Sequence, residues 1–123
     1  MIKIAFPTDD GVTISAHLGR AQYYVVATLD GANAPRFEQR AKAYHGQDSQ
    51  GHHDAHHDHN SMFAPLADCQ VLIAGGMGQP AFDHAQGMGL KVLLTGEQMI
   101  AAALGAYRSD QLVSDMRRVH VHR

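Results

Sequence analysis

The first third of the chain alternates between apolar and polar side chains, which is typical of strands with one buried face. Residues 2–6 read IKIAF, and this alternation predicts a strand that ends at Pro7, which lacks the N–H needed for a ladder. Residues 22–30 are rich in β-branched and aromatic side chains, which predicts a second strand. Weak alternation over residues 34–44 predicts its antiparallel partner. Together these segments predict an N-terminal β-meander.

The second half of the chain holds longer apolar runs without alternation. Residues 70–76 and 91–97 are apolar runs that lead into glycine, a pattern that predicts parallel strands covered on both faces. Residues 77–89 predict a helix with Pro80 in its first turn, and residues 97–107 predict another by composition and period. This order of elements predicts an α/β fold, in which a mixed sheet carries helices on its faces. A ligand crevice is expected at the carboxyl ends of the parallel strands.

Two stretches are less regular. Residues 60–69 predict a short helix, with Asn60 or Ser61 as its N-cap and Pro65 confined to its first turn. Residues 108–123 have no clear period, and their last residues are expected to fray.

Length and composition fit one domain over residues 1–123 and argue against several classes of protein. The formal net charge of -2 gives no electrostatic basis for binding nucleic acid. No window approaches the roughly 20 apolar residues of a membrane span, and the N-terminus lacks a signal-peptide pattern, so a cytoplasmic location is expected. The single cysteine, Cys69, cannot form an intramolecular disulfide or a multi-cysteine zinc site. Its position before an apolar strand predicts a small buried residue, and no serine lies in a recognisable nucleophile elbow.

Residues 45–60 read HGQDSQGHHDAHHDHN and hold six of the chain's 10 histidines. The segment cannot bury enough apolar surface to offset its ordering entropy, so a flexible insertion is predicted. Histidines four positions apart can chelate a divalent transition metal such as zinc, nickel, copper or iron(II). The candidate ligands are His52, His53, His56, His57 and His59. The same composition also fits a solvated linker that binds metal only incidentally.

Residues 76–81 read GMGQPA and fit the G-x-G-x-x-A pattern of dinucleotide-binding turns, with Glu97 about 20 residues further on. A simpler interpretation is that the glycines only allow a tight turn from strand to helix. The sequence shows only two parallel strands, fewer than a doubly wound sheet requires. Both interpretations stay open at this point.

Residues 15–24 place His17 and Arg20 on either side of Gly19. An isolated histidine in a loop is usually only a hydrogen-bonding residue. Paired with an arginine beside a glycine, it could instead ligate a metal while the guanidinium holds a negative charge. Composition alone does not decide between the two.

Three stretches in this order carry a family resemblance: KIAFPTDDG near the start, ISAHLGRAQYYVV next, and DCQVLIAGGMGQPAFDHAQGMGLKVLLT later. They resemble the dinitrogenase iron–molybdenum cofactor biosynthesis family, small domains that bind or carry nitrogenase cofactor and its precursors. The likeness covers roughly residues 1–106 without the histidine-rich segment. It implies a ribonuclease-H-like three-layer fold, in which a mixed sheet of about five strands has helices on both faces.

The resemblance also implies a function and a site. It implies a non-enzymatic domain that binds an iron–molybdenum cofactor or an iron–sulfur precursor, with nitrogenase or cofactor-assembly proteins as partners. Carried over residue by residue, it makes His17 the candidate cofactor ligand and Arg20 the adjacent cation. The turn that faces them consists of Gly75, Gly76, Met77 and Gly78. The family often has a larger aromatic residue where this chain has Leu18.

Two other functions remain open on the residues alone. The first is a histidine-rich buffer or chaperone for nickel, zinc or iron, in which residues 45–59 are the primary site. The second is a nucleotide-dependent enzyme that uses the GMGQPA turn and Glu97.

Overall fold

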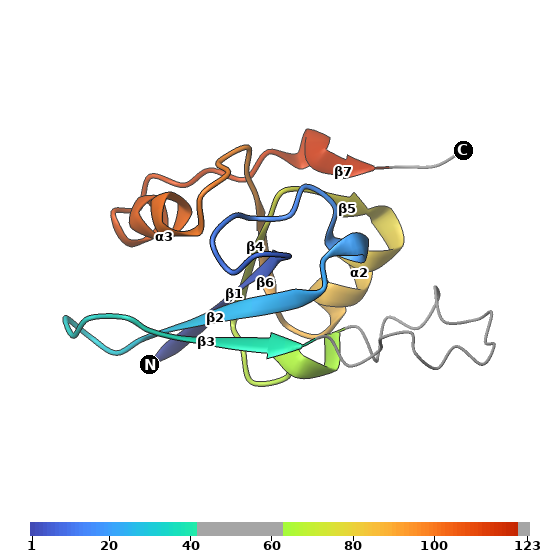
Figure 1. Ribbon diagram of the computed structural model, residues 1–123. Coiled ribbons are helices and arrows are strands. Elements are labelled where there is room, and N and C mark those ends of the chain that lie inside the picture. The colour runs from blue at the N-terminus through green and yellow to red at the C-terminus, as the bar shows by residue number, and fades with distance from the viewer. Residues whose placement is uncertain (42–62, 121–123) are drawn as a thin grey trace.

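The computed structural model describes residues 1–41 and 63–120, and Figure 1 shows a central sheet with helices on either side. Several predictions fall on residues outside these ranges. They concern the histidine-rich insertion, the N-cap at Asn60 or Ser61, and the metal ligands His52, His53, His56, His57 and His59.

Five strands form one mixed sheet in the order β3-β2-β1-β4-β6. They are β1 (Ile2–Thr8), β2 (Tyr23–Leu29), β3 (Arg36–Ala41), β4 (Val71–Ala74) and β6 (Lys91–Leu94). The strands β1, β2 and β3 are antiparallel neighbours, so the predicted meander is confirmed. The strand β4 pairs parallel with both β1 and β6, so three strands run parallel where the apolar runs predict two. Their carboxyl ends lie at the same end of the sheet.

The helices of the described residues are short. They are the 3-10 turns η1 (Leu18–Arg20), η3 (Ala64–Leu66) and η4 (Met116–Arg118) and the α-helices α2 (Gln79–Gly87) and α3 (Ile100–Arg108). Pro80 lies in the first turn of α2, as the sequence predicts. No helix in this part of the chain has the length and apolarity needed to cross a bilayer.

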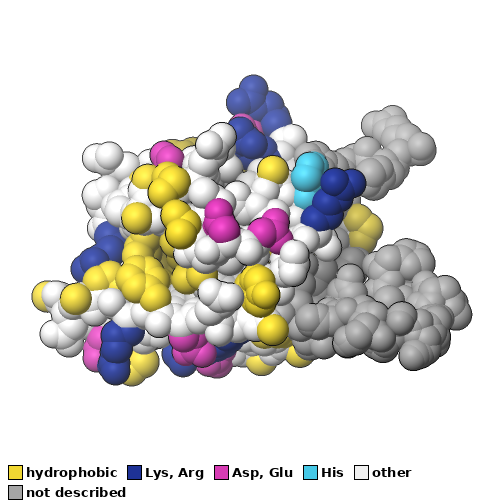
Figure 2. Space-filling model, viewed as in Figure 1, with side chains coloured by type: hydrophobic (Ala, Val, Ile, Leu, Met, Phe, Trp, Pro, Cys, Tyr) yellow, Lys and Arg dark blue, Asp and Glu magenta, His cyan; other side chains and the backbone are white. Residues whose placement is uncertain are grey.

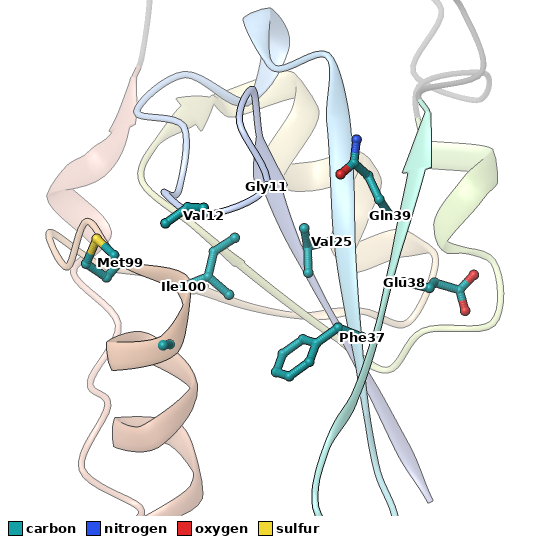
Figure 3. Close-up of a pocket in the computed structure, with 9 residues that line it drawn as sticks. Gly11, Val12, Val25, Phe37, Glu38, Gln39, Met99 and Ile100 are labelled. Atoms are coloured by element: carbon teal, nitrogen blue, oxygen red, sulfur yellow. The ribbon is translucent and has the colours of Figure 1, made fainter.

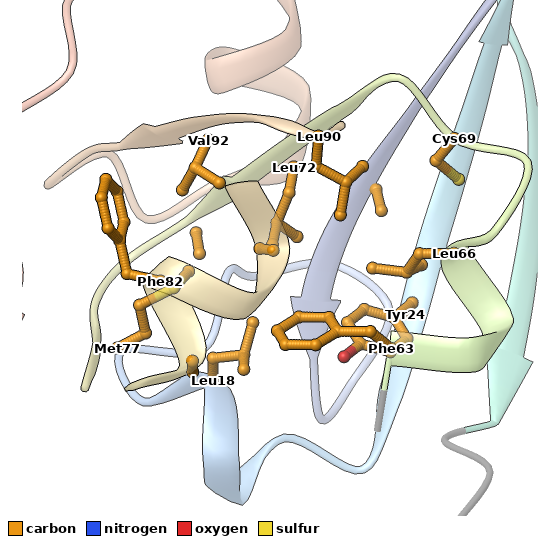
Figure 4. Close-up of a cluster of buried hydrophobic side chains, with 14 of the residues drawn as sticks. Leu18, Tyr24, Phe63, Leu66, Cys69, Leu72, Met77, Phe82, Leu90 and Val92 are labelled. Carbon is orange, nitrogen blue, oxygen red and sulfur yellow. The ribbon is translucent and has the colours of Figure 1, made fainter. Parts of the chain in front are cut away.

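Alternate side chains of the sheet enter two separate hydrophobic clusters, one on each face. On the first face Tyr24 and Leu72 pack with Phe63 and Leu66 near η3 and with Phe82 of α2, as Figure 4 shows. Full burial of each such side chain contributes about 1.5–3 kcal/mol, so this cluster stabilises the fold strongly.

The second face of the sheet is covered by α3. Phe6 of β1 and Ile73 of β4 are fully buried there with Ile100 and Leu104 of the helix. Helices therefore cover both faces of the sheet at its centre, where β4 is buried throughout, whereas the edge strand β3 stays largely exposed.

Pro7 does not end the first strand, so that prediction is wrong. Lys3 directs its backbone toward Gln70 on the β4 side: its N–H donates to the side-chain Oε1 of Gln70, and its C=O accepts from the N–H of Gln70. Backbone direction alternates along a strand, so Pro7, four residues later, also directs its backbone toward β4. The parallel pairing with β4 extends only to Ala5, so no partner strand needs an N–H from the proline. Its carbonyl oxygen accepts a hydrogen bond from the N–H of Ser15 at 2.8 Å.

A second, two-stranded sheet has no counterpart in the predictions. The strand β5 (Met77–Gly78) lies where the sequence predicts the start of a helix, and it pairs parallel with β7 (Val119–His120). Residues 108–123 show no clear period in the sequence, yet residues 119–120 form a strand. The last residues, 121–123, which are expected to fray, lie outside the described chain. The pairing holds the C-terminal segment beside the end of β4 (Figure 1).

The helix α3 starts later than the apolar period predicts. Thr13 forms a β-bridge with Met99, and the N–H of Ile14 donates to the carbonyl of Gln98 at 2.8 Å. Because these residues pair with the loop after β1, the helix begins only at Ile100.

Candidate functional site

The glycine turn after β4 is in close contact with the loop that follows β1. The N–H of Leu18 donates to the carbonyl of Gly76 at 3.1 Å. A Cβ atom on Gly75 would lie 2.8 Å from the carbonyl oxygen of Ser15 and 3.0 Å from the Cα of Ala16. These distances are too short for any side chain, so only glycine permits the approach. The two stretches that the resemblance pairs in one site therefore lie side by side.

His17 and Arg20 lie on the exposed side of this loop. Both residues are exposed, whereas Leu18 between them is fully buried and anchors the loop in the core. The Ser15 hydroxyl donates to the carbonyl of His17 at 3.0 Å and accepts from its N–H at 3.2 Å, which fixes the backbone before η1. The N–H of Arg20 donates to the same carbonyl at 3.0 Å. The structure thus presents an imidazole and a guanidinium at the surface, next to the glycine turn.

The glycine turn at residues 75–78 presents fewer groups to a ligand at the surface than its sequence suggests. Met77 is only 3% exposed and its side chain packs in the core, so its sulfur is not at the surface. Met77 and Gly78 also pair with β7. The part of the turn that remains between the strands is Gly75 and Gly76.

The C-terminal segment borders the other side of the turn. The N–H of Asp115 donates to the carbonyl of Leu94 at 2.8 Å, and the segment then runs into β7 beside β5. The guanidinium of Arg118 reaches the carbonyl of Gly75, with Nη1 at 3.4 Å from the oxygen. Sequence reasoning missed Arg118, because nothing in a polar tail indicates a contact 43 residues away.

Comparison with families of known sequences matches residues 1–110 to the family described as dinitrogenase iron-molybdenum cofactor. The chain belongs to this family. The resemblance that the sequence motifs indicate is confirmed, and the match extends over nearly the whole described chain. Comparison with curated proteins gave no match.

Several solved structures have the same fold as this chain. The apo form of the orange protein from Desulfovibrio gigas is 24% identical, with a TM-score of 0.70 over 94% of this chain and 93% of that one. A candidate NifB protein from Thermotoga is 20% identical, with a TM-score of 0.64 over 93% of both chains. A candidate dinitrogenase from Methanocaldococcus jannaschii is 10% identical, with a TM-score of 0.66 over 93% of this chain and 94% of that one. At these identities the likeness shows the fold.

The GMGQPA turn of this family member differs from a dinucleotide-binding turn. In the dinucleotide pattern the strand passes directly into the helix, whose first N–H groups face the pyrophosphate. Here β5 intervenes between β4 and α2, and it is paired with β7. Glu97 is exposed, and its N–H bonds to the Thr95 hydroxyl at 3.0 Å. This arrangement disfavours a pyrophosphate site at the turn.

Ionisable residues do not converge on a metal site within residues 1–41 and 63–120, where no group of three or more His, Cys, Asp or Glu could hold an ion. Cys69 is buried at 9% exposure, which confirms the prediction of a small buried residue. Burial raises the pKa of its thiol to about 11. The thiolate that binds metal is therefore scarce at neutral pH.

We expect Cys69 to react slowly with a thiol reagent such as Ellman's reagent at pH 8 in the folded protein. With a pKa of about 11, about one thiol in a thousand is ionised at that pH. The measurement is the labelling rate of folded protein against the rate in denaturant, where the reaction should be complete within minutes. Equal rates would contradict the buried, protonated thiol.

A separate apolar hollow lies between β3 and the start of α3. It has a volume of about 370 Å³, and Phe37, Val25 and Ile100 point into it while Glu38 points away from it (Figure 3). Figure 2 shows hydrophobic side chains gathered on this part of the surface. None of the predicted site residues lines the hollow, and its apolar walls do not suit an anionic ligand.

Proposed function

We propose that this chain binds a preassembled, anionic metal cofactor of the iron–molybdenum or iron–sulfur type and carries it without catalysing a reaction. One observation supports this above the others: the His17 loop is in direct contact with the Gly75–Gly76 turn. The buried Leu18, its hydrogen bond to Gly76 and the close approach of Gly75 fix the two parts relative to each other. Membership of the iron–molybdenum cofactor family supplies the class of ligand.

The chemistry of the site fits a cofactor that arrives complete. In such a cluster the sulfides already fill most iron coordination positions, so the protein needs to supply few ligands. A neutral imidazole from His17 can take one open position, and the guanidinium of Arg20 can balance negative charge with directed N–H groups. Backbone N–H groups at a glycine turn add weaker anion-binding dipoles. The site therefore holds its cargo loosely enough to pass it on.

We also infer that the sheet is a variant of the ribonuclease-H-like arrangement. An antiparallel meander followed by parallel strands, with helices on both faces, supports this inference. The expected recipients of the cargo are nitrogenase or cofactor-assembly proteins, which the family name indicates.

Replacing His17 by alanine tests the ligand. We expect the affinity for isolated iron–molybdenum cofactor to fall at least about tenfold, because losing even a group that only orients a metal ligand typically costs about 10–100-fold. The full chain is mixed with cofactor under anaerobic conditions, separated by gel filtration, and its molybdenum and iron are counted. His84→Ala is the matched control, because it also removes one imidazole. His84 belongs to α2 and not to the His17 loop, and its ring stacks on Phe63 with centroids 5.5 Å apart. Uptake by the His17 variant equal to wild type would remove His17 from the site.

A variant that lacks residues 46–59 separates this function from the histidine-rich buffer. It should fold and take up cofactor, since the deleted sequence holds no core-forming residues. It should lose only divalent metal binding at the histidines His52, His53, His56, His57 and His59. Loss of all metal and cofactor binding would favour the buffer instead.

A further inference from the structure

The C-terminal segment crosses the carboxyl ends of the parallel strands β4 and β6. The N–H of Leu94 donates to the Ser114 hydroxyl at 3.0 Å, and Asp115 donates back to the carbonyl of Leu94. Four residues after Asp115 the strand β7 begins, and it pairs with β5 directly after the glycine turn. We call residues 114–120 the C-terminal strap. In sheets of this kind the carboxyl ends of parallel strands are where ligands bind, so the strap borders the expected crevice.

Arg118 of the strap places its guanidinium between two glycine turns. One is the turn after β4, where Nη1 lies 3.4 Å from the carbonyl of Gly75. The other follows β6, where a Cβ on Gly96 would lie 2.5 Å from Nη2 and 3.3 Å from Cζ. Gly96 thus leaves room for a flat cation against the backbone, as an alanine would not.

The guanidinium makes little use of its donors. It carries five N–H groups. Its only hydrogen bond within the described chain is the long one to Gly75, and its buried Nε has no partner there. The nearest carboxylate oxygen, Oδ2 of Asp115, is 3.7 Å from Nε, and that carboxylate already accepts two hydrogen bonds from the side chain of Arg117. A partly desolvated cation with unfilled donors gains free energy when an anion reaches it.

Arg118 and the His17 loop both contact the Gly75–Gly76 turn. The His17 loop touches Gly75 and Gly76 through Ser15 and Leu18. Arg118 touches the carbonyl of the same Gly75. Its side chain remains 41% exposed, so a ligand can reach it.

We propose that Arg118 is a further anion-binding residue of the glycine-turn site, held in place by Gly96 and carried by the C-terminal strap. The proposal rests on the proposed function for the identity of the natural ligand. It extends the site past residue 110, where the family match ends. The ligand face it recognises carries several acceptor atoms and spread negative charge, which suits the planar fork of a guanidinium.

The experiment measures anion binding at Arg118 with and without cofactor. Inorganic sulfate is titrated against chloride at equal ionic strength while the amide resonances of Gly75 and Gly96 are followed by NMR. Wild type should show saturable shifts, Arg118→Gln should lose them, and Arg118→Lys should retain a weaker response. Arg36→Gln is the control, because Arg36 is an exposed arginine of β3, which lies at the opposite edge of the sheet from β6. Cofactor affinity should fall at least about tenfold in Arg118→Gln and change less than about twofold in the control.

Gly96→Ala tests position without removing charge. The new Cβ should push the guanidinium aside at little cost to the fold, because the clash is with the far end of a flexible side chain. We expect a several-fold weaker sulfate response and the thermal midpoint of wild type. If both Arg118 variants lose the β5–β7 pairing, Gly96→Ala still tests whether the guanidinium binds the anion. An unchanged sulfate response in Gly96→Ala would overturn the proposal.

The outcomes separate the two proposals. A sulfate response that depends on Arg118, in a protein that takes up no cofactor, supports the anion site and refutes the proposed function. Cofactor uptake that ignores Arg118, with no specific sulfate response, refutes the anion site and leaves the function standing. If wild type and Arg118→Gln give the same sulfate response, the protein binds an adventitious ion only, and the inference is overturned.

Discussion

Replacing Gly75 by alanine is expected to destabilise the protein and to abolish cofactor binding together. The added Cβ would meet the carbonyl oxygen of Ser15 at 2.8 Å and the Cα of Ala16 at 3.0 Å. Both are backbone atoms, so no side-chain rotation can relieve the clash, and the loop itself must move. Overpacking of this kind typically costs about 1–3 kcal/mol. Movement of the loop also breaks the hydrogen bond from Leu18 to Gly76, and His17 moves with it.

The matched control for this variant is Gly19→Ala. Gly19 lies in the same loop, and a Cβ there would meet no heavy atom within 4 Å. We expect the control to keep both its unfolding free energy in urea and its cofactor affinity within error of wild type. A Gly75 variant with the stability and affinity of wild type would show that the two segments do not touch in solution.

The fold was largely predictable because burial leaves a pattern in the sequence. The alternation in β1, the β-branched and aromatic residues of β2 and the continuous apolar runs of β4 and β6 each mark a strand. Alternation did not reveal that β1 is buried on both faces, because Ala5 takes the place of a polar residue on the second face. The helix α2 was signalled by Pro80 at its start and by its place between two such runs. These signals are local, and each spans several residues.

The remaining features depend on contacts that leave no local pattern. A strand of two residues such as β5 has no period, and its partner β7 lies about 40 residues away in a polar tail. Pro7 is compatible with β1 because the parallel pairing with β4 stops at Ala5, which no sequence window records. The role of Arg118 could not be predicted for the same reason, since it contacts backbone atoms of glycines far away in the sequence.

The candidate site could be predicted in part through the family resemblance. The motifs indicated that His17 and the glycine turn face each other, and the structure supplies the reason: Gly75 has no room for a side chain. The metal-ligand role of His17 remains a prediction. The same holds for the histidines of residues 45–60, which lie outside the described chain.

Replacing Arg40 by methionine is expected to lower the unfolding free energy by about 1–2 kcal/mol at pH 7, which a urea titration measures. Arg40 lies on the edge strand β3, and its Nη1 donates to Asp68 at 2.7 Å and to the carbonyl of Pro65 at 2.6 Å. Its Nη2 donates to the other carboxylate oxygen of Asp68 at 3.2 Å, and its Nε to Glu38 at 2.7 Å. The side chain is only 18% exposed, so these bonds are better shielded than most surface pairs. They join the two chain ends that flank residues 42–62.

The control for Arg40 is Arg117→Met. Arg117 also makes a two-pronged bond to a carboxylate, that of Asp115, but its side chain is 91% exposed. Water screens such a pair, so we expect an unfolding free energy within error of wild type. Equal losses in the two variants would mean that burial of Arg40 adds nothing.

The Arg40 contribution should also disappear in acid. Hydrogen bonds from Arg40 hold the pKa of Asp68 well below its usual range, and that of Glu38 is lowered by the same guanidinium. A carboxylate with a lowered folded-state pKa stabilises the fold above its unfolded pKa of about 4, and this stability is lost as the pH falls through the folded value. The difference in unfolding free energy between wild type and Arg40→Met should be constant from about pH 5 to 8 and should shrink toward pH 2. Asp10, whose pKa of about 2 reflects hydrogen bonds from the backbone of Thr13 and Val12, titrates in both proteins and cancels. A difference that stays the same at pH 2.5 would show that Arg40 acts through packing and its bond to Pro65 rather than through charge.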